Sequence, residues 1–246
     1  MLDILAITTP IFLIIAIGYI AVLRNIVPQT VVRGMGAFVI NFALPCLLIR
    51  TVIAHDINKV FNTNYLVAYG SGSLIVFALG YFFARLIARK SQQNAALQGM
   101  GMSVSNSGFI GYPIVLQLLG PTAGIALALC FIIENLVITP LALILGDSAE
   151  AEGTSRWQIL RKTLARLARN PIIIAIVIGM SISISGITLP GPIFSVIDML
   201  ASASGPVALF VIGGGLVGLK LRGLRFDMAR IVFGKLVLHP LIIFLL

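Results

Sequence analysis

Charge is scarce in this chain of 246 residues: only 10% are Asp, Glu, Lys or Arg, whereas 59% are hydrophobic. A soluble domain of this length would carry far more charge on its surface. The composition therefore excludes that class and indicates an integral membrane protein with several helices. It leaves no room for a separate soluble domain.

The chain also lacks the residue patterns of common enzyme and metal sites. Its two cysteines, Cys46 and Cys130, lie inside apolar runs, which indicates small buried residues rather than a disulfide or a metal ligand. We find no Ser-His-Asp order, no paired catalytic carboxylates, no HExxH and no Walker motif. The sequence therefore predicts no enzyme, no cofactor and no metal site.

Eight apolar segments are long enough to cross a bilayer. They are 4–23, 34–53, 65–87, 95–119, 122–145, 171–189, 192–217 and 231–246. Of the 17 basic residues, 14 lie in the connections after the first, third, fifth and seventh segments. The positive-inside rule then places these connections in the cytoplasm and the amino terminus outside the cytoplasmic (inner) membrane. The net charge of +9 thus marks topology and contacts with anionic lipid, and it does not indicate nucleic-acid binding.

Residues 146–170 form the longest hydrophilic connection. An acidic start is followed by apolar residues at positions 157, 160, 164 and 167, which predicts an amphipathic helix on the membrane surface. This linker separates a first repeat, 1–145, from a second, 171–246. The second segment of each has a polar residue four positions before a proline, Asn41 or Ser202. Because five segments precede the linker, the second repeat enters from the opposite side, as in inverted-repeat transporters.

The second repeat has only three segments, and we expect that the sequence stops before this repeat is complete. The predicted fold is an all-α membrane protein with a 5+5 inverted-repeat transporter architecture, truncated to about eight helices.

The fourth segment contains the most unusual run of residues. Polar and helix-breaking residues lie at its middle: Ser105, Asn106, Ser107, Gly108, Gly111 and Pro113. Irregular backbone at membrane depth survives only where protein or a watery cavity surrounds it. We therefore predict two half-helices, 95–107 and 113–119, with free amides near Pro113 that favour an anion. The alternative is a face of small residues for close helix packing, in which the polar side chains satisfy only the backbone.

Three further residues are candidates for function. Glu134 lies near the middle of the fifth segment, where a carboxylate is costly, and a low-dielectric surrounding that favours its neutral form makes it a candidate proton carrier. His239 in the eighth segment is a second candidate for proton coupling, although it could instead bond a carbonyl freed by Pro240. Asn41 is either a substrate contact or part of a kink that shapes the cavity wall.

The motifs in segments two, four and five together resemble the auxin efflux carrier family, especially its bacterial members. They are Asn41-Phe-Ala-Leu-Pro45, Ser105-Asn-Ser-Gly-Phe-Ile-Gly-Tyr-Pro113 and Glu134-Asn135. The resemblance implies ten helices in two inverted repeats, with the fourth and ninth broken and crossing. It further implies a scaffold of helices one, two, six and seven, an elevator-like motion of the rest, and a homodimer. Asn106 and Pro113 would lie at the substrate site. Sodium:bile-acid symporters share this architecture, which leaves the coupling ion, proton or sodium, open.

These patterns together predict a secondary transporter of a small organic anion, such as an auxin-like carboxylate or a dicarboxylate. Two alternatives stay open: a membrane sensor or lipid-binding protein that retains the fold without transport, and an ion channel.

Overall fold

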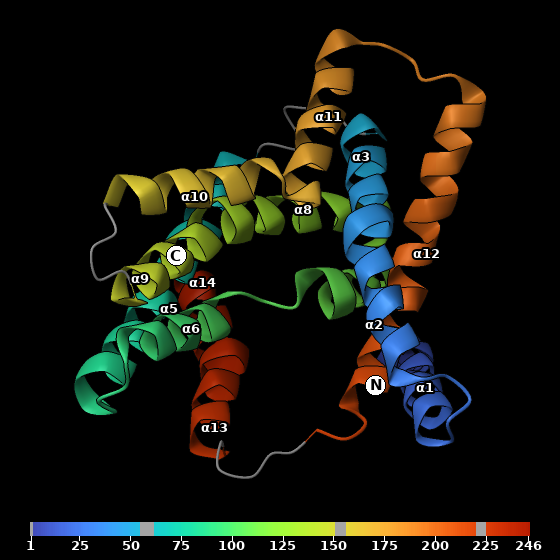
Figure 1. The fold of residues 1–246 in the computed structure, drawn as a ribbon. Coiled ribbons are helices and arrows are strands. Elements are labelled where there is room, and N and C mark those ends of the chain that lie inside the picture. The colour runs from blue at the N-terminus through green and yellow to red at the C-terminus, as the bar shows by residue number, and fades with distance from the viewer. Residues whose placement is uncertain (1, 55–61, 151–155, 220–224) are drawn as a thin grey trace. The chain divides into compact units, whose positions relative to one another are not determined.

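The computed structural model describes residues 2–54, 62–150, 156–219 and 225–246, and every regular element in these ranges is helical. Figure 1 shows these helices in chain order. The α-helices are α1 (Leu2–Leu23), α2 (Gln29–Phe38), α3 (Leu44–Ala54), α5 (Thr63–Phe82), α6 (Gln92–Ser103), α7 (Tyr112–Leu119), α8 (Ala123–Ile133), α9 (Thr139–Glu150), α10 (Arg156–Ala168), α11 (Pro171–Ser185), α12 (Gly191–Leu216), α13 (Arg225–Phe233) and α14 (His239–Leu245).

Five stretches of the described chain are π-helical, and four of them precede a proline. They are η1 (Val39–Ala43), η2 (Phe83–Ile87), η3 (Ser107–Gly111), η5 (Glu134–Ile138) and η6 (Gly234–Leu238), beside one 3₁₀ turn, η4 (Gly120–Thr122). In η1, η3, η5 and η6 the proline comes two residues after the π turn ends. Proline has no amide hydrogen and its ring collides with the carbonyl one turn earlier. A single wide turn before it accommodates both defects and lets the helix continue.

Each of the eight predicted segments is largely helical, although the fourth is interrupted and the sixth ends at Ser185. By length and composition, five described stretches are able to span a membrane, or six if α10 and α11 count as one broken span. They are Gln29–Ala54, Thr63–Ile87, Gln92–Asp147, Gly191–Leu216 and Phe226–Leu245. The third is 56 residues long and contains both the fourth and the fifth predicted segments. The first predicted segment, 4–23, lies within the 22-residue helix α1 (Leu2–Leu23).

The chain divides into two compact units. Unit 1 comprises Met1–Val60, Asn106–Ala128 and Ile174–Lys220, and unit 2 comprises Phe61–Ser105, Leu129–Ile173 and Leu221–Leu246. Unit 1 thus gathers the first, second, sixth and seventh apolar segments, the four that the resemblance assigns to a scaffold. It also holds the second half of the broken segment and the start of the fifth.

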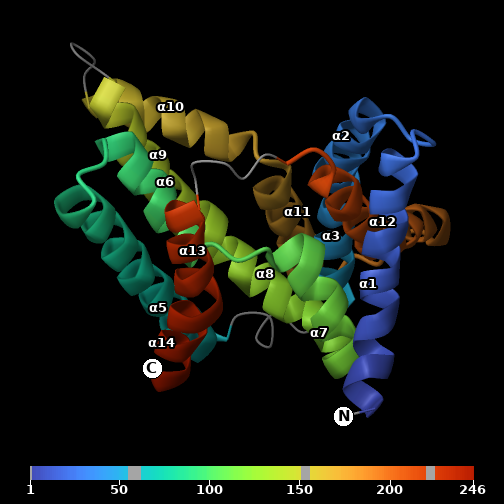
Figure 2. The same cartoon turned by 90° about the horizontal axis from the view of Figure 1, so that it is seen from below.

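In unit 1, the long helix α12 packs against α1, α2 and α3, and Figure 2 shows α1 running beside it. Two glycines permit this close approach. A Cβ atom at Gly18 would overlap the backbone of Phe210, and one at Gly213 would overlap the carbonyl oxygen of Ile15. Small residues that let helix backbones meet are the usual means of packing within a membrane, where burial of apolar surface gives no net drive.

In unit 2, α6 packs along both α5 and α9 (Figure 1). Its core contains Tyr69, Phe77, Ile133, Ile138 and Ala142. The predicted linker helix is present as α10, and it is tied to α9 by ion pairs from Lys162 and Arg166 to Asp147. Trp157 and Leu164 on its apolar stripe are 67% and 53% exposed, which leaves them available to lipid.

Candidate functional site

The fourth apolar segment is broken, as predicted, but the break comes earlier. In unit 2, α6 ends at Ser103, and Val104 is extended, with φ −93° and ψ 120°. In unit 1, helical structure resumes at Ser107, and its first backbone bonds end at the carbonyl of Asn106. The break therefore occupies residues 104–106.

The predicted half-helix bounds, 95–107 and 113–119, are wrong for a physical reason. Pro113 does lie in the first turn of α7, as expected. However, the wide π turn η3 accommodates Pro113, and η3 continues directly into α7. The second half-helix therefore begins at Ser107 rather than at Pro113. The end that favours an anion is accordingly at Ser107 rather than at Pro113.

Ser105 belongs to unit 2, where its backbone amide meets a buried carboxylate. The amide of Ser105 donates to Oε1 of Glu134 over 3.2 Å, and the hydroxyl of Tyr69 donates to the same oxygen over 2.7 Å. Glu134 is only 3% exposed. A backbone amide freed by the break thus gains a charge-capable acceptor, which lipid would not supply.

His239 lies in the same unit and is also 3% exposed. Its Nε2 atom is 2.9 Å from the hydroxyl of Ser73, and its ring meets the edge of Tyr69 with centroids 5.5 Å apart. Tyr69 therefore touches both Glu134 and His239. The expected alternative for His239, a bond to a carbonyl freed by Pro240, is replaced by the bond to Ser73.

Lys235 is a third ionisable residue near this pair. It lies in the π turn η6, four residues before His239, and is half-buried. We call Glu134, His239, Lys235, Tyr69 and Ser73 the unit 2 polar cluster. Ionisable side chains within apolar segments are costly, and such groups mark functional positions in membrane proteins.

The two asparagines within π turns, Asn41 in η1 and Asn135 in η5, each donate to a carbonyl of their own helix. Asn41 donates to the carbonyl of Ala37 over 2.7 Å, and Asn135 donates to that of Phe131 over 3.0 Å. Asn135 also accepts a bond of 3.0 Å from Asn170. These amides satisfy carbonyls that a π turn leaves poorly paired.

Unit 1 contains a cavity of about 360 Å³ beside the second half-helix. Its polar lining comes from Arg50, Tyr112, Gln117, Ser202 and Ser204, and the rest is mostly aliphatic and proline side chains. Of the predicted substrate residues, Pro113 lines this cavity, whereas Asn41, Asn106, Ser107, Gly108 and Gly111 are not among its lining residues.

The cation of this cavity is held by an acidic residue of α12. The NH1 atom of Arg50 lies 2.6 Å from Oδ1 of Asp198 and 3.2 Å from the hydroxyl of Ser202. The sequence did not reveal this pair, because the two residues lie 148 positions apart. The available signal was the opposite charge of the two side chains, each of which is isolated in an apolar segment.

Comparisons with known proteins identify a family. The model of a family described as membrane transport protein matches residues 4–246. A protein of Rhizobium meliloti (strain 1021) named "Putative malonate transporter" is 26% identical over 245 residues, covering 100% of this chain and 77% of that protein. The uncharacterized transporter YfdV of Escherichia coli (strain K12) is 25% identical, covering 96% and 76%. The lysosomal cholesterol signaling protein of Mus musculus is 28% identical, covering 94% of this chain but 28% of that protein.

Proposed function

This chain belongs to the membrane transport protein family, and from that premise we propose that it is a secondary transporter of a small organic anion. The membership agrees with the motifs that resemble the auxin efflux carriers. The observation that carries the proposal is the broken fourth span, whose freed amide at Ser105 bonds to the buried Glu134. Substrate sites of inverted-repeat transporters are built from such discontinuous helices.

A short dicarboxylate is the substrate class that we propose. The residues that contact it are those of the broken segment, Ser105, Asn106, Ser107, Gly108, Gly111 and Pro113, together with Asn41. Two features of unit 1 support an anion. The half-helix that starts at Ser107 directs its amide end, which carries partial positive charge, toward the break. The cavity next to Pro113 contains the guanidinium of Arg50, whose planar fork suits a carboxylate. The similarity to a protein named for malonate supports the same class.

Proton coupling is the role that we propose for Glu134 and His239. Their shared neighbour Tyr69 links them, since it bonds to Glu134 and stacks against His239. Protonation of Glu134 would change the bond that holds the amide of Ser105. The state of the carboxylate would thereby reach the broken segment through one hydrogen bond.

The motion that we propose is of the elevator type, in which one unit carries the substrate past the other. The division of the chain into two compact units supports it. The orientation with the amino terminus outside the cytoplasmic membrane, and a homodimeric assembly, belong to the same proposal.

The decisive experiment is uptake of radiolabelled malonate by the purified full-length protein in proteoliposomes. We expect saturable uptake that is driven by an inward proton gradient. Unlabelled short dicarboxylates should inhibit this uptake competitively. Flux that rises linearly with substrate would indicate a channel instead. If protein that is monodisperse and thermally stable takes up nothing under proton or sodium gradients, the transport proposal fails.

One comparison favours a second function, a membrane sensor without transport. The chain is 28% identical to a protein named for cholesterol signaling. A sensor would bind its ligand and change conformation, yet it would give no counterflow of labelled substrate in the same proteoliposomes. Binding without counterflow therefore identifies this alternative.

A further inference from the structure

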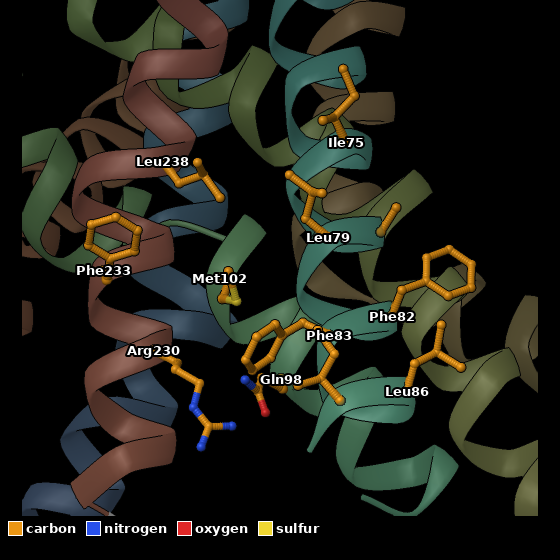
Figure 3. A pocket seen from close by; sticks show the side chains of 12 residues that line it. Ile75, Leu79, Phe82, Phe83, Leu86, Gln98, Met102, Arg230, Phe233 and Leu238 are labelled. Atoms are coloured by element: carbon orange, nitrogen blue, oxygen red, sulfur yellow. The ribbon is translucent and has the colours of Figure 1, made fainter. Parts of the chain in front are cut away.

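An apolar groove on the outer surface of unit 2 has two polar donors at one end. The groove has a volume of about 650 Å³ and lies between α5–η2 and α13–η6, with α6 as its floor. Figure 3 shows Leu79, Met102, Phe233 and Leu238 along it, and the nitrogen atoms of Arg230 and Gln98 together at one end.

Both nitrogens lack hydrogen-bond partners among the residues that the structure describes. They are Nε2 of Gln98, a residue only 5% exposed, and NH1 of Arg230. The guanidinium of Arg230 is stacked over the ring of Phe83, 5.3 Å from its centroid, which fixes its direction. A buried donor without a partner is rare because it costs free energy, so the amide of Gln98 indicates a missing acceptor group, whereas the nitrogen of Arg230 is 3.5 Å from a carboxylate oxygen of Asp227.

The charges at this end of the groove favour an anion. Asp227 is shared by two cations: its Oδ2 lies 2.9 Å from Nζ of Lys90, and its Oδ1 lies 3.5 Å from NH1 of Arg230. Arg85 lies at the same end, where it donates to the carbonyl of Lys90 over 3.0 Å. Two cations, Lys90 and Arg230, thus share one carboxylate, which leaves a net positive charge.

The rest of the groove matches a lipid chain. From Ile75 to Ile87 the wall formed by α5 and η2 rises about 18 Å at 1.5 Å per residue. One leaflet of the hydrocarbon core is about 15 Å thick. The rim residues Phe82, Leu86 and Ile87 are 55%, 70% and 69% exposed, so no described residue covers this side of the groove.

We propose that this groove binds one anionic phospholipid. Its phosphate accepts hydrogen bonds from Arg230 and Gln98, and an acyl chain lies along Leu79, Met102, Phe233 and Leu238. Basic pockets between membrane helices on the cytoplasmic side are suited to such headgroups. The inference does not depend on the transport proposal, because it uses none of the residues at the broken segment.

The test compares lipid retention in nanodiscs that contain equal amounts of phosphatidylglycerol and phosphatidylcholine with identical acyl chains. Native mass spectrometry of the released protein counts the retained lipids. We expect a preference for phosphatidylglycerol that Arg230→Gln lowers about five-fold, the effect of one basic side chain at a membrane surface. Arg33→Gln, which removes an exposed cation of unit 1, is the matched control and should keep the preference.

Two further variants separate binding from folding. Ala78→Trp fills the groove and should abolish retention of the lipid, whereas Val67→Trp on the exposed face of the same helix should not. Gln98→Leu removes the unpaired amide, so it should lower retention of phosphatidylglycerol and raise the melting temperature in pure phosphatidylcholine. Equal retention of both lipids by the unaltered protein overturns the proposal. So does an Arg33→Gln effect as large as that of Arg230→Gln, or a melting temperature that falls in Gln98→Leu.

Discussion

The hydroxyl of Tyr69 donates a 2.7 Å hydrogen bond to the same carboxylate oxygen of Glu134 that accepts the amide of Ser105. The carboxylate therefore joins the third and fifth apolar segments to the broken fourth. This arrangement explains why an acidic side chain is retained at 3% exposure within an apolar span. A change at either donor should therefore alter the protonation equilibrium of Glu134.

Tyr69→Phe tests that relationship. A donated hydrogen bond stabilises a carboxylate relative to the carboxylic acid, so its loss favours protonation. We expect the midpoint of the pH profile of uptake to move to higher pH. Tyr65→Phe is a matched control on the same helix, because the hydroxyl of Tyr65 faces the Sγ atom of Cys130 at 3.1 Å. A profile that moves equally in both variants would assign the effect to packing.

Glu134→Gln should remove the pH dependence of uptake while substrate binding is preserved. The amide oxygen of glutamine still accepts from Tyr69 and from the amide of Ser105, but the side chain no longer titrates. Uptake is to be measured from pH 5 to 8, with and without sodium. An unchanged pH profile would exclude Glu134 as the coupling carboxylate and would favour a sodium-coupled or uncoupled mechanism.

Asn106→Ala should lower uptake at least about ten-fold, the effect of losing one good hydrogen bond to a charged group. Asn106 is exposed, and its side chain makes no capping bond to the turn that follows it. Its loss should therefore leave the melting temperature nearly unchanged. Asn94→Ala, an exposed asparagine at the start of α6, is the control and should transport normally. Unchanged uptake kinetics in Asn106→Ala would show that this amide has a structural role.

Gly213→Ala should destabilise the protein by about 1–3 kcal/mol, the usual cost of overpacking. The added methyl group would overlap the carbonyl oxygen of Ile15 on α1, and backbone cannot move aside as a side chain can. Gly215→Ala in the same helix is the control, since no atom lies within 4 Å of its added Cβ. Thermal unfolding in detergent measures both variants. Equal melting temperatures would contradict the close approach of α1 and α12.

A cysteine at position 153 should be inaccessible from outside intact cells. The residue lies outside the described ranges, and its sidedness is predicted from the basic residues of the linker. In a background with Cys46 and Cys130 replaced by alanine, an impermeant maleimide should label Gly153→Cys only after permeabilisation. Thr188→Cys, exposed between α11 and α12, should be labelled in intact cells. The reverse pattern would invert the topology.

Much of the fold was predictable from residue order. The eight apolar segments, the surface helix at 156–168 and the broken fourth segment all follow from periodicity and from helix breakers. The position of the break did not follow, because it depends on how Pro113 is accommodated. From sequence, a proline is expected to end a helix. In the structure, the turn before Pro113 is widened into a π turn and the helix continues past the proline.

The site was predictable only in part. Glu134 and His239 were identifiable because ionisable residues are costly in an apolar span. Their partners Tyr69 and Ser73 were not, since a tyrosine and a serine in an apolar segment usually satisfy themselves locally. The pairing of Arg50 with Asp198 was also missed, because these residues are 148 positions apart.

Sequence alone determined the class of this protein, its helical segments and its family, because each of these depends on local composition and on motifs within one span. Tertiary structure alone decided which polar groups meet. A hydrogen bond of about 3 Å between two helices that are distant in the chain forms only if each helix has the right rotation about its own axis and the right depth in the membrane. Packing at Gly18 and Gly213 and the widened turns before Pro113, Pro140 and Pro240 set that rotation and depth.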